Sequence, residues 1–204
     1  MDDAELLQAW AAGDRDAGER LYSRHFEAIY RFFRSKLDGD IADLVQRTFL
    51  GLLEAAPRFR GSASVRTYVF AIAKNQLHSH CRAKHREREL EFSITSLADL
   101  DPTPSTIAIR HAEQRLLLEA LRRLPLELQI LVELHYWEGL AGPELAEVLE
   151  LPEGTVRSRL RRAMARLRDE LEVLAESRER LESTLSDLDG WARSLRGTID
   201  RWAG

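Results

Sequence analysis

Residues 140–163 read LAGPELAEVLELPEGTVRSRLRRA, and this stretch decides the fold of the second half of the chain. Two runs with apolar residues at helical spacing stand on either side of Pro152 and Gly154, which predicts two helices joined by a tight turn. Pro143 suits the first turn of the earlier helix. Ala146 is small enough to let the second helix cross closely. The stretch therefore predicts a helix-turn-helix.

The second of these helices is expected to be strongly basic on its outer side. Val156, Leu160 and Ala163 have the spacing of a buried face. The polar residues left to point outward or sideways are Thr155, Arg157, Ser158, Arg159, Arg161 and Arg162. Guanidinium groups near the start of a helix can read guanine edges in the major groove and bind phosphates. An ordinary helical hairpin with a solvated arginine face is the alternative; we favour DNA binding because turn chemistry and charge agree.

Charge alternates along the chain, although the net charge is only −4. Residues 57–90 hold eight basic and two acidic residues, and residues 154–168 hold six arginines and no acidic residue. Residues 115–153 between them are acidic, with eight glutamates against three arginines. Two basic segments separated by acidic ones are what a polyanion contacted at two places would favour. The glutamates of residues 127–150 are expected to form a solvated face.

Helical periodicity extends over the rest of the chain and predicts an all-α fold. Asp2 or Asp3, Asp14 or Asp16, and Ser64 are suitable N-caps for helices in the first half. The expected organisation is a helical domain over 1–89, an acidic linker over 90–105, a helix-turn-helix domain over 106–168 and a helical extension over 169–204. The second domain should hold helices at about 106–124, 126–138, 142–149 and from 154 onward.

The basic segment of the first domain combines cations with aromatic rings beside a loop at 58–64. Arginine, lysine and aromatic rings are what single-stranded DNA needs, since cations follow the backbone while rings or pockets accept unstacked bases. Phe59 lies in the predicted loop, which favours such a role. Tyr68 also fits the apolar stripe of the following helix, so core packing and base stacking are equally open for this residue.

These features occur together with four further segments: DLVQRTF at 43–49, RFRG at 58–61, RTYVFAIAKN at 66–75 and LPLE at 124–127. In this order, and with the helix-turn-helix, they resemble regions two and four of sigma-70-type RNA polymerase sigma factors. The short linker resembles that of the extracytoplasmic-function (ECF) subfamily. The resemblance covers about residues 5–168 and is specific because several motifs coincide.

The resemblance implies a role for each segment. Asp43, Leu44, Gln46 and Phe49 would contact the clamp helices of core RNA polymerase. The minus-ten element would be captured and melted by Arg58, Phe59, Arg60, Ser62, Ser64, Arg66, Tyr68, Lys74 and Asn75. The minus-thirty-five element of promoter DNA would face Thr155, Arg157, Ser158, Arg159, Arg161 and Arg162, and the linker would run toward the polymerase active-site channel. The sequence departs from the family at Arg47, usually acidic, at Tyr68, usually tryptophan, and at Val65, usually phenylalanine.

The C-terminal extension carries an apolar seam that continues from Leu167 in alternating steps of four and three residues, interrupted by Arg178. Such a seam needs a partner surface. Gly190 and Gly197 argue for a break between two helices, since each costs about 1 kcal/mol in a helix interior. We hypothesise that the acidic extension docks on the chain's own domains or on a regulator and restrains promoter binding; simple extension of the domain core is the alternative. An anti-sigma factor is a separate candidate partner.

Other function classes have little support in the sequence. No nucleophile–base pair, metal cage or phosphate-binding glycine loop stands out, so we expect no enzyme activity, no catalytic residue, no metal and no cofactor. His78, His80, Cys81 and His85 have helical spacing that could hold a metal, but a polar face beside DNA is the favoured interpretation. The acidic start and the short apolar runs predict a cytoplasmic protein without membrane insertion. A stand-alone helix-turn-helix regulator is the main rival, and a sigma antagonist is a third reading.

Overall fold

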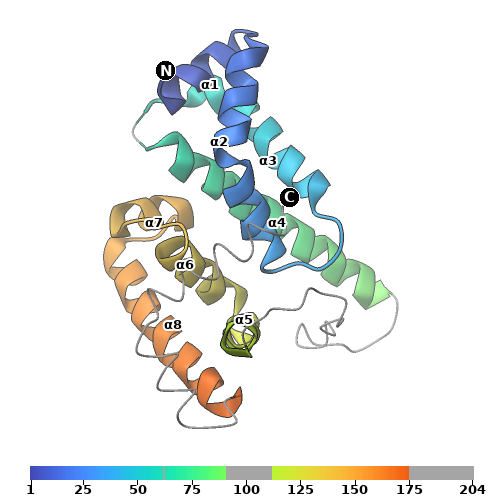
Figure 1. Cartoon of the computed structure of the whole chain (residues 1–204), viewed down its shortest axis with the longest axis vertical. Helices are drawn as coiled ribbons and strands as arrows, with labels where there is room; N and C mark the ends of the chain where they lie inside the picture. Colours follow the sequence, from blue (N-terminus) through green and yellow to red (C-terminus); the bar gives the residue numbers. More distant parts are fainter. Residues whose placement is uncertain (62, 91–111, 175–204) are drawn as a thin grey trace.

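The computed structural model describes residues 1–61, 63–90 and 112–174. Over these residues the chain is helical and contains no strand, which confirms the all-α prediction (Figure 1). The elements in chain order are α1 (Asp3–Ala11), α2 (Arg15–Arg34), α3 (Ala42–Ala55), η1 (Ala56–Arg58), α4 (Val65–Leu90), α5 (Ala112–Arg123), α6 (Leu126–Tyr136), α7 (Gly142–Leu149) and α8 (Glu153–Leu174).

Side-chain caps fix the starts of the helices in the first half. Asp2 accepts a hydrogen bond from the Glu5 amide at 2.8 Å, and the Glu5 carboxylate accepts one from the Asp2 amide, which makes a capping box. Asp14 caps α2 through the Ala17 amide at 3.1 Å. Ser64 caps α4 by accepting from the Thr67 amide at 3.0 Å. All three residues were among the caps predicted from the sequence.

Helices α1 to α4 enclose a core of aliphatic and aromatic side chains. Phe33 at the end of α2 and Phe70 on α4 are both fully buried, and Phe32 contacts Phe70 edge to face. Leu21 and Ile29 of α2 are also fully buried. This core holds α4 against α2 and α3, so the basic surface of α4 has a fixed position relative to the α3 surface.

Helix α6 is buried from Leu128 to Leu134 and joins the two halves of the molecule. On one side, Leu128 and Val132 pack with α5 and α8 in a second apolar cluster. On the other side, Ile130, Leu131 and Leu134 belong to the same apolar cluster as the core of α1 to α4. Gln129 and Glu133 are buried among these apolar side chains, whereas Glu127 at the start of the helix is exposed. The second domain therefore packs directly against the first, with α7 beside α4 (Figure 1).

Two predicted segments fall wholly or largely outside the described residues: most of the acidic linker, and the C-terminal extension beyond residue 174. The first positions of the leucine seam are described. Leu167 and Leu171 are buried in the apolar cluster that α8 forms with α5 and α6. The start of the seam thus belongs to the core of the second domain. Over the described residues, none of the helices has the length and apolar composition that crossing a membrane would require.

The close approach of α1 to α2 gives a test of this packing. A Cβ at Gly18 would lie 2.5 Å from ring atoms of Trp10, so the glycine is what admits the indole. We expect Gly18→Ala to lower the free energy of unfolding by about 1–3 kcal/mol, the usual cost of overpacking. Urea unfolding followed by circular dichroism measures it. Gly142→Ala is the matched control because its Cβ would meet nothing within 4 Å, and equal effects of the two changes would contradict the packing described here.

Candidate nucleic-acid and partner interfaces

The arginine surface of α8 is open to solvent. Arg157, Ser158, Arg161 and Arg162 are exposed, whereas Thr155 and Arg159 are half-buried. Val156 and Ala163 are buried on the opposite face, as the periodicity predicted. The hydroxyl of Ser158 donates to the backbone carbonyl of Thr155 at 2.9 Å, so its oxygen keeps its capacity to accept a hydrogen bond. Four exposed polar side chains on the second helix of the turn motif give α8 the chemistry that a major-groove reader needs.

The turn before α8 has an unusual backbone. Glu150, which follows α7, has φ 56° and lies in the left-handed region. Glycine or asparagine usually takes this place at a helix end, because a larger side chain costs about 1–2 kcal/mol there. The amide of Leu151 donates to the Ala146 carbonyl at 3.0 Å, and this hydrogen bond closes the turn.

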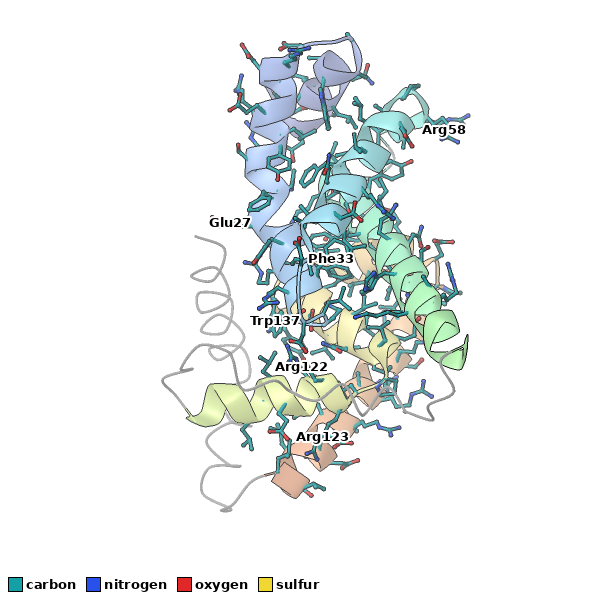
Figure 2. The ribbon with its side chains drawn as sticks, turned by 90° about the vertical axis from the view of Figure 1, so that its right-hand side faces the viewer. Glu27, Phe33, Arg58, Arg122, Arg123 and Trp137 are labelled. Atoms are coloured by element: carbon teal, nitrogen blue, oxygen red, sulfur yellow. The ribbon has the colours of Figure 1, made fainter. Side chains whose placement is uncertain are left out.

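The residues predicted to meet the minus-ten element have very different environments. Arg58, Arg60, Ser64 and Asn75 are exposed, and Figure 2 shows Arg58 at the end of the first domain that lies away from α5. Phe59 and Tyr68 are half-buried, and their ring centroids are 5.7 Å apart. Arg66 is half-buried and Lys74 is buried, with both contacting the second domain. Ser62 lies outside the described residues. Only some of the residues grouped by the sequence pattern therefore face solvent.

The α3 residues predicted to contact polymerase divide in the same way. Asp43 and Gln46 are exposed, while Leu44 and Phe49 are 5% and 3% exposed and belong to the core. Beside them lies an apolar surface that was not predicted from the sequence. Tyr22 and Leu50 are large side chains with 39% and 49% exposure. The Tyr22 ring packs on Phe49 and Phe26, with centroids 4.6 and 5.2 Å apart, and Phe26 packs on Tyr30 at 5.7 Å.

The four-residue spacing of Tyr22, Phe26 and Tyr30 is the signal that would have found this surface, since such residues share one face of a helix. Arg47, at the position where the family usually has an acidic residue, forms an exposed ion pair with Asp43 at 2.8 Å. The exposed part of α3 therefore carries a neutralised pair next to apolar side chains.

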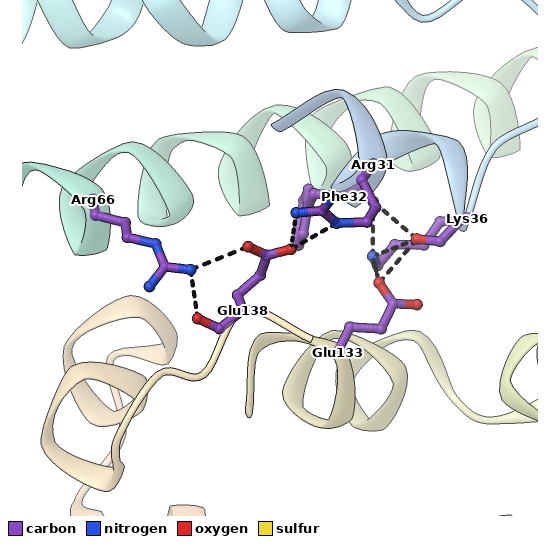
Figure 3. A network of polar contacts seen from close by, with 7 residues as sticks. Arg31, Phe32, Lys36, Arg66, Glu133 and Glu138 are labelled. Carbon is purple, nitrogen blue, oxygen red and sulfur yellow. Dashed lines mark hydrogen bonds and ion pairs between the residues drawn. The ribbon is translucent and has the colours of Figure 1, made fainter. Parts of the chain in front are cut away.

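A buried network of charges connects the two domains (Figure 3). Arg31 of α2 is 2% exposed and donates to the Glu138 carboxylate with its Nε at 2.9 Å and its Nη2 at 2.8 Å. Arg66 of α4 approaches the same carboxylate from the other side, with Nη2 to Oε2 at 3.1 Å, and also donates to the Glu138 carbonyl. Two arginines of the first domain thus share one carboxylate of the second.

A second part of the network surrounds Glu133 of α6. Lys36 and Ser35 both donate to its Oε2, the latter at 2.9 Å, and Gln129 donates to its Oε1 at 3.0 Å. The Lys36 ammonium also donates to the Phe32 carbonyl at 2.7 Å and lies 4.0 Å from the centre of the Phe32 ring. Burial lowers the pKa of Lys36, and the charge of Glu133 opposes that shift. Every carboxylate oxygen of Glu133 therefore has a donor.

These contacts correct one expectation. The glutamates of residues 127–150 were predicted to form a solvated face, and this is wrong for Glu133 and Glu138, which are 1% and 5% exposed. The physical reason is that both find cations on the first domain, between 72 and 107 residues earlier in the chain. The sequence pattern of residues 127–150 alone cannot reveal partners that lie in the first domain.

Two members of the histidine and cysteine cluster on α4, His78 and Cys81, have described surroundings. His78 lies 3.3 Å from the Glu127 carboxylate across the domain interface. Burial raises the pKa of the Cys81 thiol, with Lys84 opposing the shift. Over the described residues, no three His, Cys, Asp or Glu side chains are grouped as a metal ion would require.

Comparisons with known proteins agree with this arrangement. The family description "Sigma-70 region 2" matches residues 20–87, and "Sigma-70, region 4" matches residues 114–167. The ECF RNA polymerase sigma factor SigM of Mycobacterium tuberculosis is 36% identical over 170 residues, which is 81% of this chain and 82% of SigM. This chain belongs to the ECF RNA polymerase sigma factors. The ECF sigma-E factor of Haemophilus influenzae is 27% identical over 85% of this chain and 97% of its own length.

Solved structures share the fold of this ECF sigma factor. CnrH, solved in complex with the cytosolic domain of CnrY, matches 85% of this chain and 99% of its own, with a TM-score of 0.61 and 23% identity. The sigma factor RpoE of Bartonella quintana, solved with the anti-sigma factor NepR, matches 76% of this chain and 96% of its own, with a TM-score of 0.59 and 23% identity. The resemblance inferred from the sequence motifs is confirmed.

The buried network gives a test by mutation. Glu133→Leu leaves the Lys36 ammonium buried without its carboxylate, and we expect the free energy of unfolding to fall by about 3–5 kcal/mol. The double change Lys36→Met with Glu133→Leu should recover most of this stability, because apolar side chains of similar volume can replace a buried ion pair. Urea titration of both variants measures the difference. A double variant no more stable than the single one would show that Lys36 is not the group that depends on Glu133.

Proposed function

We propose that this ECF sigma factor initiates transcription with three separate surfaces. The exposed face of α2 and α3, with Tyr22, Asp43, Gln46 and Leu50, binds the clamp helices of core RNA polymerase. The loop before α4 and the start of α4 bind and open the minus-ten element. The arginine face of α8 reads the minus-thirty-five element. The observation that carries this proposal is the solvent-exposed arginine row on α8, together with the family membership.

DNA opening in this proposal needs no catalytic step by the chain itself. Cations and rings that hold a separated strand shift the equilibrium toward open DNA, because they bind the open form more tightly than the duplex. The factor would act in the cytoplasm, where polymerase and promoters are found. Since CnrH and the Bartonella RpoE were solved with CnrY and with an anti-sigma factor respectively, an anti-sigma factor is a further expected partner.

Run-off transcription with core RNA polymerase and a promoter library tests the proposal. The wild-type chain should select a subset of promoters, whereas a folded chain that binds duplex but directs no initiation would be a stand-alone regulator.

Removing arginines from α8 tests the DNA surface. We expect Arg157→Ala with Arg161→Ala to weaken binding to a selected promoter duplex. The slope of log affinity against log salt should become shallower by about 0.9 for each phosphate that the variant no longer neutralises. Arg166→Ala with Arg168→Ala is the control, because these arginines are exposed further along the same helix. An equal effect of both pairs would mean that only general charge matters.

The polymerase surface has its own test. Leu50→Asp places a charge on the exposed apolar face of α3, and we expect the dissociation constant for core polymerase to rise at least about tenfold, as when a central apolar side chain of an interface is removed. Val173→Asp is the matched control, since Val173 is a 74% exposed apolar residue on the last turn of α8. Equal affinities of the two variants, measured by competition for labelled wild-type chain, would place the polymerase-binding surface elsewhere.

A further inference from the structure

Arg66 and Lys74, two of the cations expected to bind the minus-ten element, form ion pairs with carboxylates of the second domain. The Arg66 guanidinium lies 3.1 Å from Oε2 of Glu138, and the Lys74 ammonium lies 3.0 Å from Oε1 of Glu150. Lys74 is only 7% exposed, because α7 and the turn that follows cover this part of α4. The arginine face of α8 is open in the same structure. Two cations of the minus-ten surface are therefore paired within the chain, while Arg58 and Arg60 of that surface and the arginines of α8 are exposed.

The backbone conformation of Glu150 suggests that its contact with Lys74 has a function. Its side chain is 72% exposed, so burial in the second domain does not hold it in place. Its φ of 56° is a conformation that glycine or asparagine adopts at lower cost. A strained residue kept at a turn is a reason to look for a function of its side chain. Here the side chain reaches across the domain interface to a cation of α4.

We propose that Glu138 and Glu150 form an intramolecular latch that takes the place of DNA phosphates on Arg66 and Lys74. In the free chain the latch withholds these two cations from single-stranded DNA and so weakens its binding to the minus-ten surface, while the α8 surface stays accessible. This proposal rests on the proposed role of Arg66 and Lys74 in binding DNA. It adds that the same two cations have two successive partners, a carboxylate in the closed chain and a phosphate in the promoter complex.

Single-stranded DNA alone is a weak competitor for the closed form. Besides the two ion pairs, separation of the domains would expose Ile130, Leu131 and Leu134, which pack in the core of the first domain. A ligand shifts such an equilibrium only by the difference in its affinity for the two states. In the proposed function core polymerase binds the first domain while promoter DNA binds α8 of the second, and this joint engagement is expected to hold the domains apart.

Glu150→Asn tests the latch without endangering the fold. Asparagine tolerates the left-handed backbone, so the change removes the carboxylate and relieves strain together. Glu147→Gln is the control, because it removes one negative charge from an exposed position of α7, where Glu147 has no ion pair with α4 among the described residues. Both are compared with wild type by fluorescence anisotropy, using a labelled mixed-sequence oligonucleotide as a single strand and as a duplex.

We expect Glu150→Asn to bind the single strand about two- to fivefold more tightly, the size of one partly exposed ion pair. The ratio of single-strand to duplex affinity should rise, and the salt slope for the single strand should steepen by about 0.7 for the cation set free. The double variant with Glu138→Gln should steepen it by about 1.4 if both cations are released. Identical ratios for Glu150→Asn and Glu147→Gln would overturn the latch.

Transcription separates failure of the latch from failure of the proposed function. With saturating core polymerase, wild type and Glu150→Asn should give equal run-off yields, because polymerase opens both. If wild type directs run-off transcription but Glu150→Asn leaves the ratio of single-strand to duplex affinity unchanged, the sigma function stands and the latch is rejected. If Glu150→Asn binds the single strand more tightly but neither chain directs initiation, the latch stands and the proposed function is rejected. Lys74→Gln in the Glu150→Asn background should restore the wild-type salt slope if Lys74 is the cation released.

Discussion

The arrangement of the two domains depends on the need of Glu133 and Glu138 for positive charge. Both carboxylates lie in or directly after the central helix α6, where removal from water costs several kcal/mol for each unpaired ion. Within the described part of the second domain, Glu133 has Gln129 as a donor. The compensating charges are Arg31, Lys36 and Arg66 of the first domain. The two domains must therefore meet in one register, with the end of α2 and the start of α4 against α6 and the turn that follows it.

An interface of this kind is specific without being permanent. Buried ion pairs add little net stability compared with well-packed apolar groups, but they strongly disfavour arrangements that leave a charge unpaired. When the domains separate, water can solvate the same charges, so opening is less costly than for a purely apolar surface of equal area. The apolar contacts of Ile130, Leu131 and Leu134 hold the domains together, and the charges set their orientation. Both properties suit the latch that we propose, which is closed in the free chain and opened on polymerase.

Local features of the fold could be predicted from the sequence because their causes are local. The caps at Asp2, Asp14 and Ser64, the breaks between helices, and the buried face of α8 all follow from residues within a few turns of each other. The burial of Leu44 and Phe49, and the exposure of Tyr22 and Leu50, depend on which helices pack around α3. The partners of Glu133 on the first domain lie 97 and 98 residues away in sequence. Helical periodicity cannot contain such information, which is why these glutamates were assigned to solvent.

The alternation of charge along the chain has a second meaning once the structure is known. Two basic segments indicated a polyanion bound at two places, and the acidic residues between them had no assigned role. In the folded chain the acidic segment faces the first basic segment: Glu127 lies by His78, Glu138 by Arg66 and Glu150 by Lys74, all along α4. The exposed arginines of the second basic segment, on α8, stay open to solvent. Positive charge that suits a phosphate suits a carboxylate equally well. In the latch that we propose, Arg66 and Lys74 therefore bind the chain's own carboxylates first and DNA phosphates afterwards.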